Sequence, residues 1–229
     1  MKLVFTPYPH YIHKVLVVAA EAGVLGRLGF IRQVPFAPDR SLYQYNPLGK
    51  VPALQLDDGE PFYGGLLACE YLDSLRTDGK TLFPTSERKW EAKRQMMLGD
   101  GLFDATTLLR VLSWKDKEKW DLDYMGRERH KVMTILTHME RDARAFRPGE
   151  FHIGHVCFAG GLSYLDLQCP INKLALEPGD ESFDWRTGRP ALEAWYNEVI
   201  KRPSMDMNAA HAAIGALNQP PPSENRAKG

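Results

Sequence analysis

The segment from Asn46 to Asp73 places a proline, Pro52, directly before a short apolar run, Ala53 to Leu56. Proline has no N–H to give to a β-ladder, so it favours the entrance of a strand over its middle. A bond preceding proline adopts the cis form at a cost of about 0.5–1 kcal/mol. A cis bond here would turn the N–H and C=O of Val51 outward. We therefore predict a strand from residue 53, with a backbone clamp for an extended ligand in front of it.

Two glycines, Gly64 and Gly65, open a helical pattern that runs from Leu66 to Leu75. The first N–H groups of a helix have no partner within the helix, and glycine leaves them uncovered. Such a terminus attracts an anion, for example a carboxylate. The alternative is a hairpin followed by a helix, with the glycines serving only as turn residues.

The first third of the chain alternates between strand and helix patterns. Asp-Gly between two apolar runs is a strong hairpin signal, and it stands at Asp58-Gly59. A β-α-β unit followed by β-β-α predicts a mixed sheet covered by helices. The expected strands are Lys2 to Phe5, Leu28 to Val34, Ala53 to Leu56 and Pro61 to Tyr63, with helices at His10 to Ala22 and Leu66 to Leu75.

Beyond Gly79 only helical periodicity remains, so the second part of the chain is predicted to be all-α and the fold class α+β. Leu82-Phe83-Pro84 looks like an anchored linker, and Ser86 is a candidate helix cap. The expected helices are Glu87 to Leu112, Gly126 to Phe146, Val156 to Leu167 and Pro190 to Ile200.

Charge and composition restrict the kind of partner. The 229 residues carry 29 basic and 29 acidic side chains, and this balance argues against nucleic acid or a membrane surface as a partner. No apolar run reaches the roughly 18 residues of a membrane helix. The three cysteines, Cys69, Cys157 and Cys169, form no pairing motif. We expect reduced thiols and a cytoplasmic protein.

Several motifs occur in an order that resembles the cytosolic glutathione transferase family, especially its bacterial and fungal members. They are NPLGKVPAL, YGGLLACEYLD, Leu-Phe-Pro, GDGLFDA and WRTGRPALEAWYNEVIKRPS. The resemblance implies a thioredoxin-like glutathione-binding domain (1–78), a linker (79–86), an all-α helical-bundle domain that supplies the second substrate pocket (87–217) and a mobile tail (218–229). It also implies a homodimer.

The resemblance assigns a glutathione site. Val51 would pair its backbone with the cysteinyl part of glutathione beside a cis Pro52. Lys50 would reach the glycyl carboxylate, or else be an ordinary solvated lysine. The family has an acidic residue and a serine where this chain has Gly64 and Gly65. Only backbone donors would then hold the γ-glutamyl carboxylate.

The residue that activates the thiol is also unusual. Many family members have serine where this chain has Pro9, which cannot donate a hydrogen bond. The candidates to replace it are Tyr8, which we favour, Thr6 and His10. Tyr11 either borders the substrate pocket or packs on its helix.

A helical face after Gly101 is expected to border the hydrophobic-substrate pocket, although ordinary interior packing also explains it. It carries Phe103, Thr106, Thr107, Arg110 and Trp114. The family's helix-capping box is replaced by His152 and His155, with His155 Nδ1 expected as the replacement acceptor. These histidines lack a third ligand, so no metal is expected.

The sequence thus predicts a protein that binds glutathione as a co-substrate and uses its thiol on a small hydrophobic electrophile, by conjugation or by isomerisation or elimination. Two alternatives remain open because Pro9 and Gly65 replace the usual serines. One is a non-catalytic member that binds glutathione or a hydrophobic ligand. The other is a glutathione-independent lyase or isomerase on the same fold.

Overall fold

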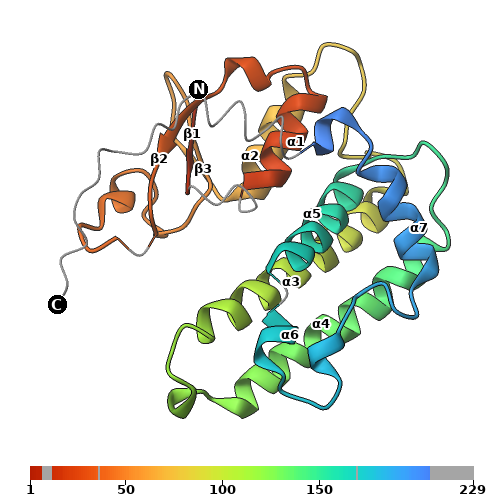
Figure 1. The fold of residues 1–229 in the computed structure, drawn as a ribbon. Helices are drawn as coiled ribbons and strands as arrows, with labels where there is room; N and C mark the ends of the chain where they lie inside the picture. Colours follow the sequence, from red (N-terminus) through yellow and green to blue (C-terminus); the bar gives the residue numbers. More distant parts are fainter. Residues whose placement is uncertain (7–11, 36, 169, 207–229) are drawn as a thin grey trace.

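The computed structural model describes residues 1–6, 12–35, 37–168 and 170–206 (Figure 1). Its first part is a four-stranded sheet in the order β2-β1-β3-β4. β1 and β2 are parallel, whereas β3 is antiparallel to both β1 and β4. This mixed sheet confirms the predicted thioredoxin-like domain. The strands are β1 (Lys2–Phe5), β2 (Gly29–Arg32), β3 (Ala53–Gln55) and β4 (Phe62–Tyr63).

Two helices, α1 (His13–Glu21) and α2 (Gly65–Ser74), lie side by side between the sheet and the helical domain (Figure 1). α1 ends where the sequence predicts, because Gly23 adopts a φ of +71° that other residues avoid. The N–H of Gly23 bonds to the carbonyl of Ala20, and that of Val24 bonds to Ala19. This paired arrangement satisfies the last carbonyls of the helix.

The helical domain is arranged around α5, which is buried on nearly all sides. α3 packs against both α4 and α5, and α7 packs against α4 (Figure 1). A helix that is apolar all round belongs in a core, and α5 has such a sequence. The helices are α3 (Lys89–Leu112), α4 (Leu122–Ala143), α5 (Ile153–Gln168), α6 (Pro170–Leu174) and α7 (Pro190–Val199). The short α6 is not predicted from the sequence.

Glycines let α3 and α5 approach closely. A Cβ atom built on Gly99 would lie 2.3 Å from the carbonyl carbon of Cys157 and 2.7 Å from the backbone nitrogen of Phe158. A Cβ on Gly161 would lie 2.9 Å from the carbonyl oxygen of Gly99. The two helix backbones therefore touch where both helices border the cavity described below.

The connection between the domains is fixed by hydrogen bonds to both. One carboxylate oxygen of Asp73, in α2, accepts the N–H of Leu82 at 3.0 Å, and the other accepts the hydroxyl of Thr81. The carbonyl of Leu82 accepts the N–H of Ile153, at the start of α5, at 2.8 Å. Leu82 is itself buried, so this segment is held to both parts of the molecule.

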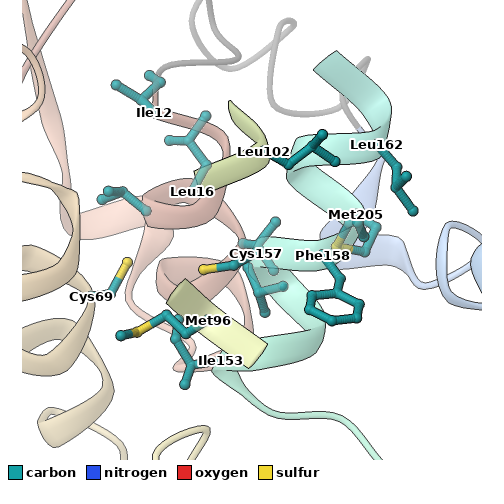
Figure 2. Packing of buried hydrophobic residues seen from close by; sticks show 14 of the residues in the cluster. Ile12, Leu16, Cys69, Met96, Leu102, Ile153, Cys157, Phe158, Leu162 and Met205 are labelled. Carbon is teal, nitrogen blue, oxygen red and sulfur yellow. The ribbon is translucent and has the colours of Figure 1, made fainter. Parts of the chain in front are cut away.

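One hydrophobic cluster runs through both domains. Figure 2 shows Leu16 of α1 and Cys69 of α2 on one side, facing Met96 of α3 and Cys157 and Phe158 of α5. The domains share this core, so burying it holds α1 and α2 against α3 and α5. Cys69 and Cys157 are free, buried thiols.

Two cap predictions differ from the structure. α3 begins at Lys89, and Ser86 contributes only its backbone carbonyl, to the N–H of Lys89. At the start of α5, the acceptor for the N–H of Gly154 is Nδ1 of His152, at 3.1 Å, and not that of His155. The His155 ring instead stacks on the His152 ring, at a centroid distance of 3.8 Å.

Candidate functional site

A cavity of about 710 Å³ lies between the two domains. The thioredoxin-like domain contributes the end of β1, the start of α1, the loop before β3 and the start of α2. The helical domain contributes one face of α3 and the middle of α5. A volume of this size is typical of a site for a small organic molecule.

The loop before β3 is held in shape by Asn46, whose side chain is fully buried. Its amide nitrogen donates to the carbonyl of Lys50 at 2.7 Å, and its oxygen accepts the N–H of Leu48 at 2.9 Å. Gly49 has a φ of +63°, and a Cβ there would lie 2.8 Å from the hydroxyl of Tyr43. The sequence NPLG thus shapes the segment that presents residues 50–52.

The peptide bond between Val51 and Pro52 is cis. Both residues line the cavity together with Lys50. Within the described part of the chain, the N–H and C=O of Val51 make no backbone hydrogen bond, whereas the carbonyl of Pro52 accepts the N–H of Gly64 at 3.1 Å. The main chain of Val51 is therefore available to an extended ligand.

The start of α2 forms the neighbouring wall. Gly64 is the N-cap residue with a φ of +88°, a conformation that favours glycine, and no side chain caps the helix. Gly65 lines the cavity, whereas Gly64 does not. Of the two predicted carboxylate-binding glycines, only Gly65 thus faces the cavity.

An ion pair joins the domains inside the cavity. Nζ of Lys14, on α1, lies 2.7 Å from both carboxylate oxygens of Asp100, on α3. Burial acts to lower the pKa of Lys14, but the negative charge of Asp100 and the hydrogen bond to its carboxylate outweigh it and raise the pKa. The lysine is therefore charged at neutral pH.

The same surroundings raise the pKa of two further acidic groups. Burial, and then the charge of Asp100, raise the pKa of Asp104 one helical turn away. Burial and the charge of Asp100 also raise the pKa of the Cys157 thiol well above its usual range. Cys157 is therefore a protonated, unreactive thiol at the cavity floor.

Sequence reasoning missed both Lys14 and Asp100. The available signal was a lysine inside the apolar run of α1 and an aspartate between two glycines of α3. A charged residue in such a position is buried only when it is paired. The sequence alone does not reveal that the two partners lie opposite each other.

The predicted substrate wall on α3 is largely brought together. Phe103, Thr107, Arg110 and Trp114 all line the cavity, and the Arg110 guanidinium lies over the Trp114 ring at 5.2 Å. Thr106 is fully buried and is not among the lining residues. The helix turns its side chain into the core, as interior packing predicts.

Of the residues predicted to activate the thiol, the structure describes only Thr6. Thr6 follows β1, is buried and lines the cavity. Tyr8, His10 and Tyr11 lie outside the described residues, so their positions stay predictions.

Neither a metal cluster nor a membrane-spanning helix occurs in the described ranges. Within residues 1–6, 12–35, 37–168 and 170–206, no group of three or more His, Cys, Asp or Glu side chains is arranged to hold a metal ion. Over the same ranges, none of the helices has the length and apolar character needed to cross a bilayer.

Comparison with known proteins identifies the family. The profile described as "Glutathione S-transferase, N-terminal domain" matches residues 10–75. A crystal structure of a glutathione transferase family member from Pseudomonas fluorescens Pf-5, with bound glutathione, is 35% identical, with a TM-score of 0.78. The alignment covers 89% of this chain and 96% of that one. The chain therefore belongs to the glutathione transferase family.

Two other proteins are similar over the same length. A glutathione S-transferase of Methylobacillus flagellatus KT, solved with glutathione bound, is 28% identical over 90% of this chain and 97% of its own, with a TM-score of 0.77. The uncharacterised GST-like protein YibF of Escherichia coli K12 is 26% identical over 206 residues, which are 89% of this chain and 96% of YibF. The family resemblance predicted from the motifs is confirmed.

Proposed function

We propose that this protein binds glutathione in the cavity between its domains and uses the thiol on a small hydrophobic electrophile. The observation that supports this most directly is the main chain of Val51, which lines the cavity without a backbone partner before the cis Pro52. Antiparallel main-chain pairing is how an extended peptide is held at a sheet edge. The glutathione seen in the Pseudomonas fluorescens relative adds support.

The remaining groups have proposed roles along the ligand. Lys50 would pair with the glycyl carboxylate, and the N–H groups at the start of α2 from Gly65 onward would face the γ-glutamyl end, because the N–H of Gly64 is already bonded to the carbonyl of Pro52. The α3 wall, with Tyr11 beside it, would hold the second substrate. Its residues are Phe103, Thr107, Arg110 and Trp114.

The chemistry requires a thiolate. A thiol has a pKa near 8.5, so a donor beside the sulfur raises the thiolate fraction at neutral pH. Tyr8 is the proposed donor, with Thr6 and His10 as the other candidates. The thiolate sulfur would form a bond to the electrophilic carbon. In a substitution this carbon releases its leaving group with the electron pair of the broken bond, and in an addition that pair moves to another atom of the acceptor, which takes up a proton.

The experiment is calorimetric titration with glutathione, followed by a conjugation assay with 1-chloro-2,4-dinitrobenzene. Tyr8→Phe should lower the conjugation rate at least about tenfold, because a donor that lowers the thiol pKa by about one unit raises the thiolate fraction by that factor. Thr6→Val is the matched comparison, because Thr6 would carry the loss if it were the donor. Absence of binding at millimolar glutathione refutes the proposal.

A second candidate is a family member that binds glutathione or a hydrophobic ligand without turnover. A related candidate is a lyase or isomerase that needs no glutathione. The specific observation in their favour is that Pro9 and Gly65 replace the two serines of the family pattern. Glutathione binding without conjugation would support the binding member. The glutathione affinity of the Tyr8→Phe variant should then equal that of the wild-type protein.

We also propose that a second copy of the chain is a partner. Apolar side chains are exposed on α2 (Leu66 and Leu67) and on α3 (Trp90 and Met97). Apolar side chains that form one exposed patch mark a contact surface, and we propose that these four do so. Light scattering should give twice the monomer mass, and Trp90→Glu combined with Met97→Glu should shift it towards the monomer.

A further inference from the structure

Lys14 occupies the space that a side chain at position 65 would need. A Cβ atom built on Gly65 would lie 2.7 Å from Cε of Lys14 and 3.6 Å from its Nζ. The nearest other atom, Cγ of Pro52, would be 3.5 Å away. The glycine thus leaves room for an ammonium group close to where a serine hydroxyl would stand.

Among the residues that the structure describes, the hydrogen-bond partner given for the Lys14 ammonium group is Asp100, so a donor is left there for a ligand. A lysine head has three N–H donors, and Asp100 accepts through two oxygens, each 2.7 Å from Nζ. The Lys14 side chain is 22% exposed and lines the cavity beside Gly65. The head is therefore held by α3 but still reachable from the cavity.

We propose that Lys14 binds the α-carboxylate of the γ-glutamyl residue of glutathione, in place of the serine hydroxyl that the family has at position 65. This inference rests on the proposed glutathione function. A charge-assisted hydrogen bond is about twice as strong as a neutral one. The N–H groups at the start of α2 add a second, weaker attraction for the same carboxylate.

Asp100 positions the lysine. A lysine side chain has many rotamers, and an ion pair that fixes one of them lowers the entropy lost on binding. Because Asp100 lies on α3 and Lys14 on α1, both domains together set where the cation stands. The γ-glutamyl end would then be recognised across the domain boundary, whereas the cysteinyl end is recognised by Val51 within one domain.

The test compares two ligands by calorimetry: glutathione, and its analogue in which the γ-glutamyl α-carboxylate is a carboxamide. The wild-type protein should prefer glutathione by at least about tenfold, the usual value of a hydrogen bond to a charged group. Lys14→Met should bring this preference close to one. Lys50→Met is the matched control, because it should weaken both ligands alike and keep the preference.

Two further variants guard against misfolding. Lys14→Met leaves Asp100 without its partner, so Lys14→Met combined with Asp100→Asn removes both charges and should lose the same preference. Combining Gly65→Ser with Lys14→Ala should restore part of the preference that Lys14→Ala alone loses, because alanine removes the Cε atom that a serine Cβ would meet and so leaves space for the hydroxyl.

The outcomes separate this inference from the proposed function. A wild-type protein that binds glutathione but shows no preference, or Lys14 variants that keep it, would overturn the inference alone. Equal weakening of both ligands by Lys14→Met would also overturn it, by showing a purely structural lysine. A wild-type protein that does not bind glutathione overturns both.

Discussion

Gly99→Ala tests the close approach of α3 and α5. The added methyl group would lie 2.3 Å from the carbonyl carbon of Cys157 and 2.5 Å from its oxygen. Carbon atoms normally make contact at about 3.5–4.0 Å, so the methyl group is about 1 Å too close. The atoms that it meets are backbone atoms of a buried helix and cannot rotate away, so the two helices must separate.

The magnitude follows from two opposing effects. Overpacking a tight core costs roughly 1–3 kcal/mol, and a rigid backbone partner places this site at the upper end of that range. Alanine is more favourable than glycine within a helix by about 1 kcal/mol. We expect Gly99→Ala to lower the free energy of unfolding by about 2 kcal/mol.

Gly101→Ala is the matched control on the same helix. Its methyl group would meet only Cδ1 of Ile135, at an ordinary contact distance of 3.5 Å. The gain in helix propensity then acts alone and should raise stability by about 0.5–1 kcal/mol. The two variants should therefore differ by about 3 kcal/mol although each adds one methyl group.

The assay is urea unfolding followed by circular dichroism, at one protein concentration so that any association is equal in all samples. Thermal unfolding of the same samples should show a difference of several degrees in Tm, at about 2–4 °C per kcal/mol for a chain of this size. If Gly99→Ala were as stable as Gly101→Ala, the contact between the two helix backbones would not exist as described.

Three further outcomes are expected. Asp73→Ala should cost about 1–3 kcal/mol in urea unfolding because it removes the acceptor of the buried Leu82 N–H, whereas Asp73→Asn, which keeps an acceptor oxygen, should cost less; equal losses would contradict this. Asn46→Ala should weaken glutathione binding by at least about tenfold while the protein stays folded, because the carbonyl of Lys50 loses its donor; unchanged calorimetric affinity would refute the role given to this loop. Burial lowers the pKa of His155 from 6.5 to about 2, so the unfolded chain alone takes up its proton below pH 6.5. Stability should therefore fall by about 2 kcal/mol between pH 7 and pH 5 because of this group, and the fall should be smaller in His155→Phe.

The fold was predictable because its signals are local. The proline before β3, the hairpin at Asp58-Gly59 and the glycine after α1 each act through the backbone of their own segment. The ends of helices were less accurate, since α4 begins at Leu122 and α6 is absent from the prediction. Both depend on packing against distant elements, which periodicity does not describe.

In the candidate site, too, the residues of a local motif were predictable and those that meet only in the folded chain were not. Val51, Pro52 and Gly65 belong to one continuous motif, and all three line the cavity. Lys14 and Asp100 are 86 positions apart, and only the meeting of α1 with α3 makes them a pair. For the capping histidines, residue types were correctly singled out, but the choice between His152 and His155 depended on ring orientation.

The anchored linker and the shared core have a consequence for exchanging parts between relatives. The carbonyl and N–H of Leu82 are each used by a different domain, and the cluster in Figure 2 is filled from both sides. A chimera that joined this sheet domain to another helical bundle would have to keep complementary packing around Cys69 and Cys157, where the two parts meet, as well as the linker contacts. The proposed selectivity for a second substrate should therefore be easier to alter at the cavity wall from Phe103 to Trp114, along the end of α3 and just beyond it, than by exchanging a whole half of the molecule.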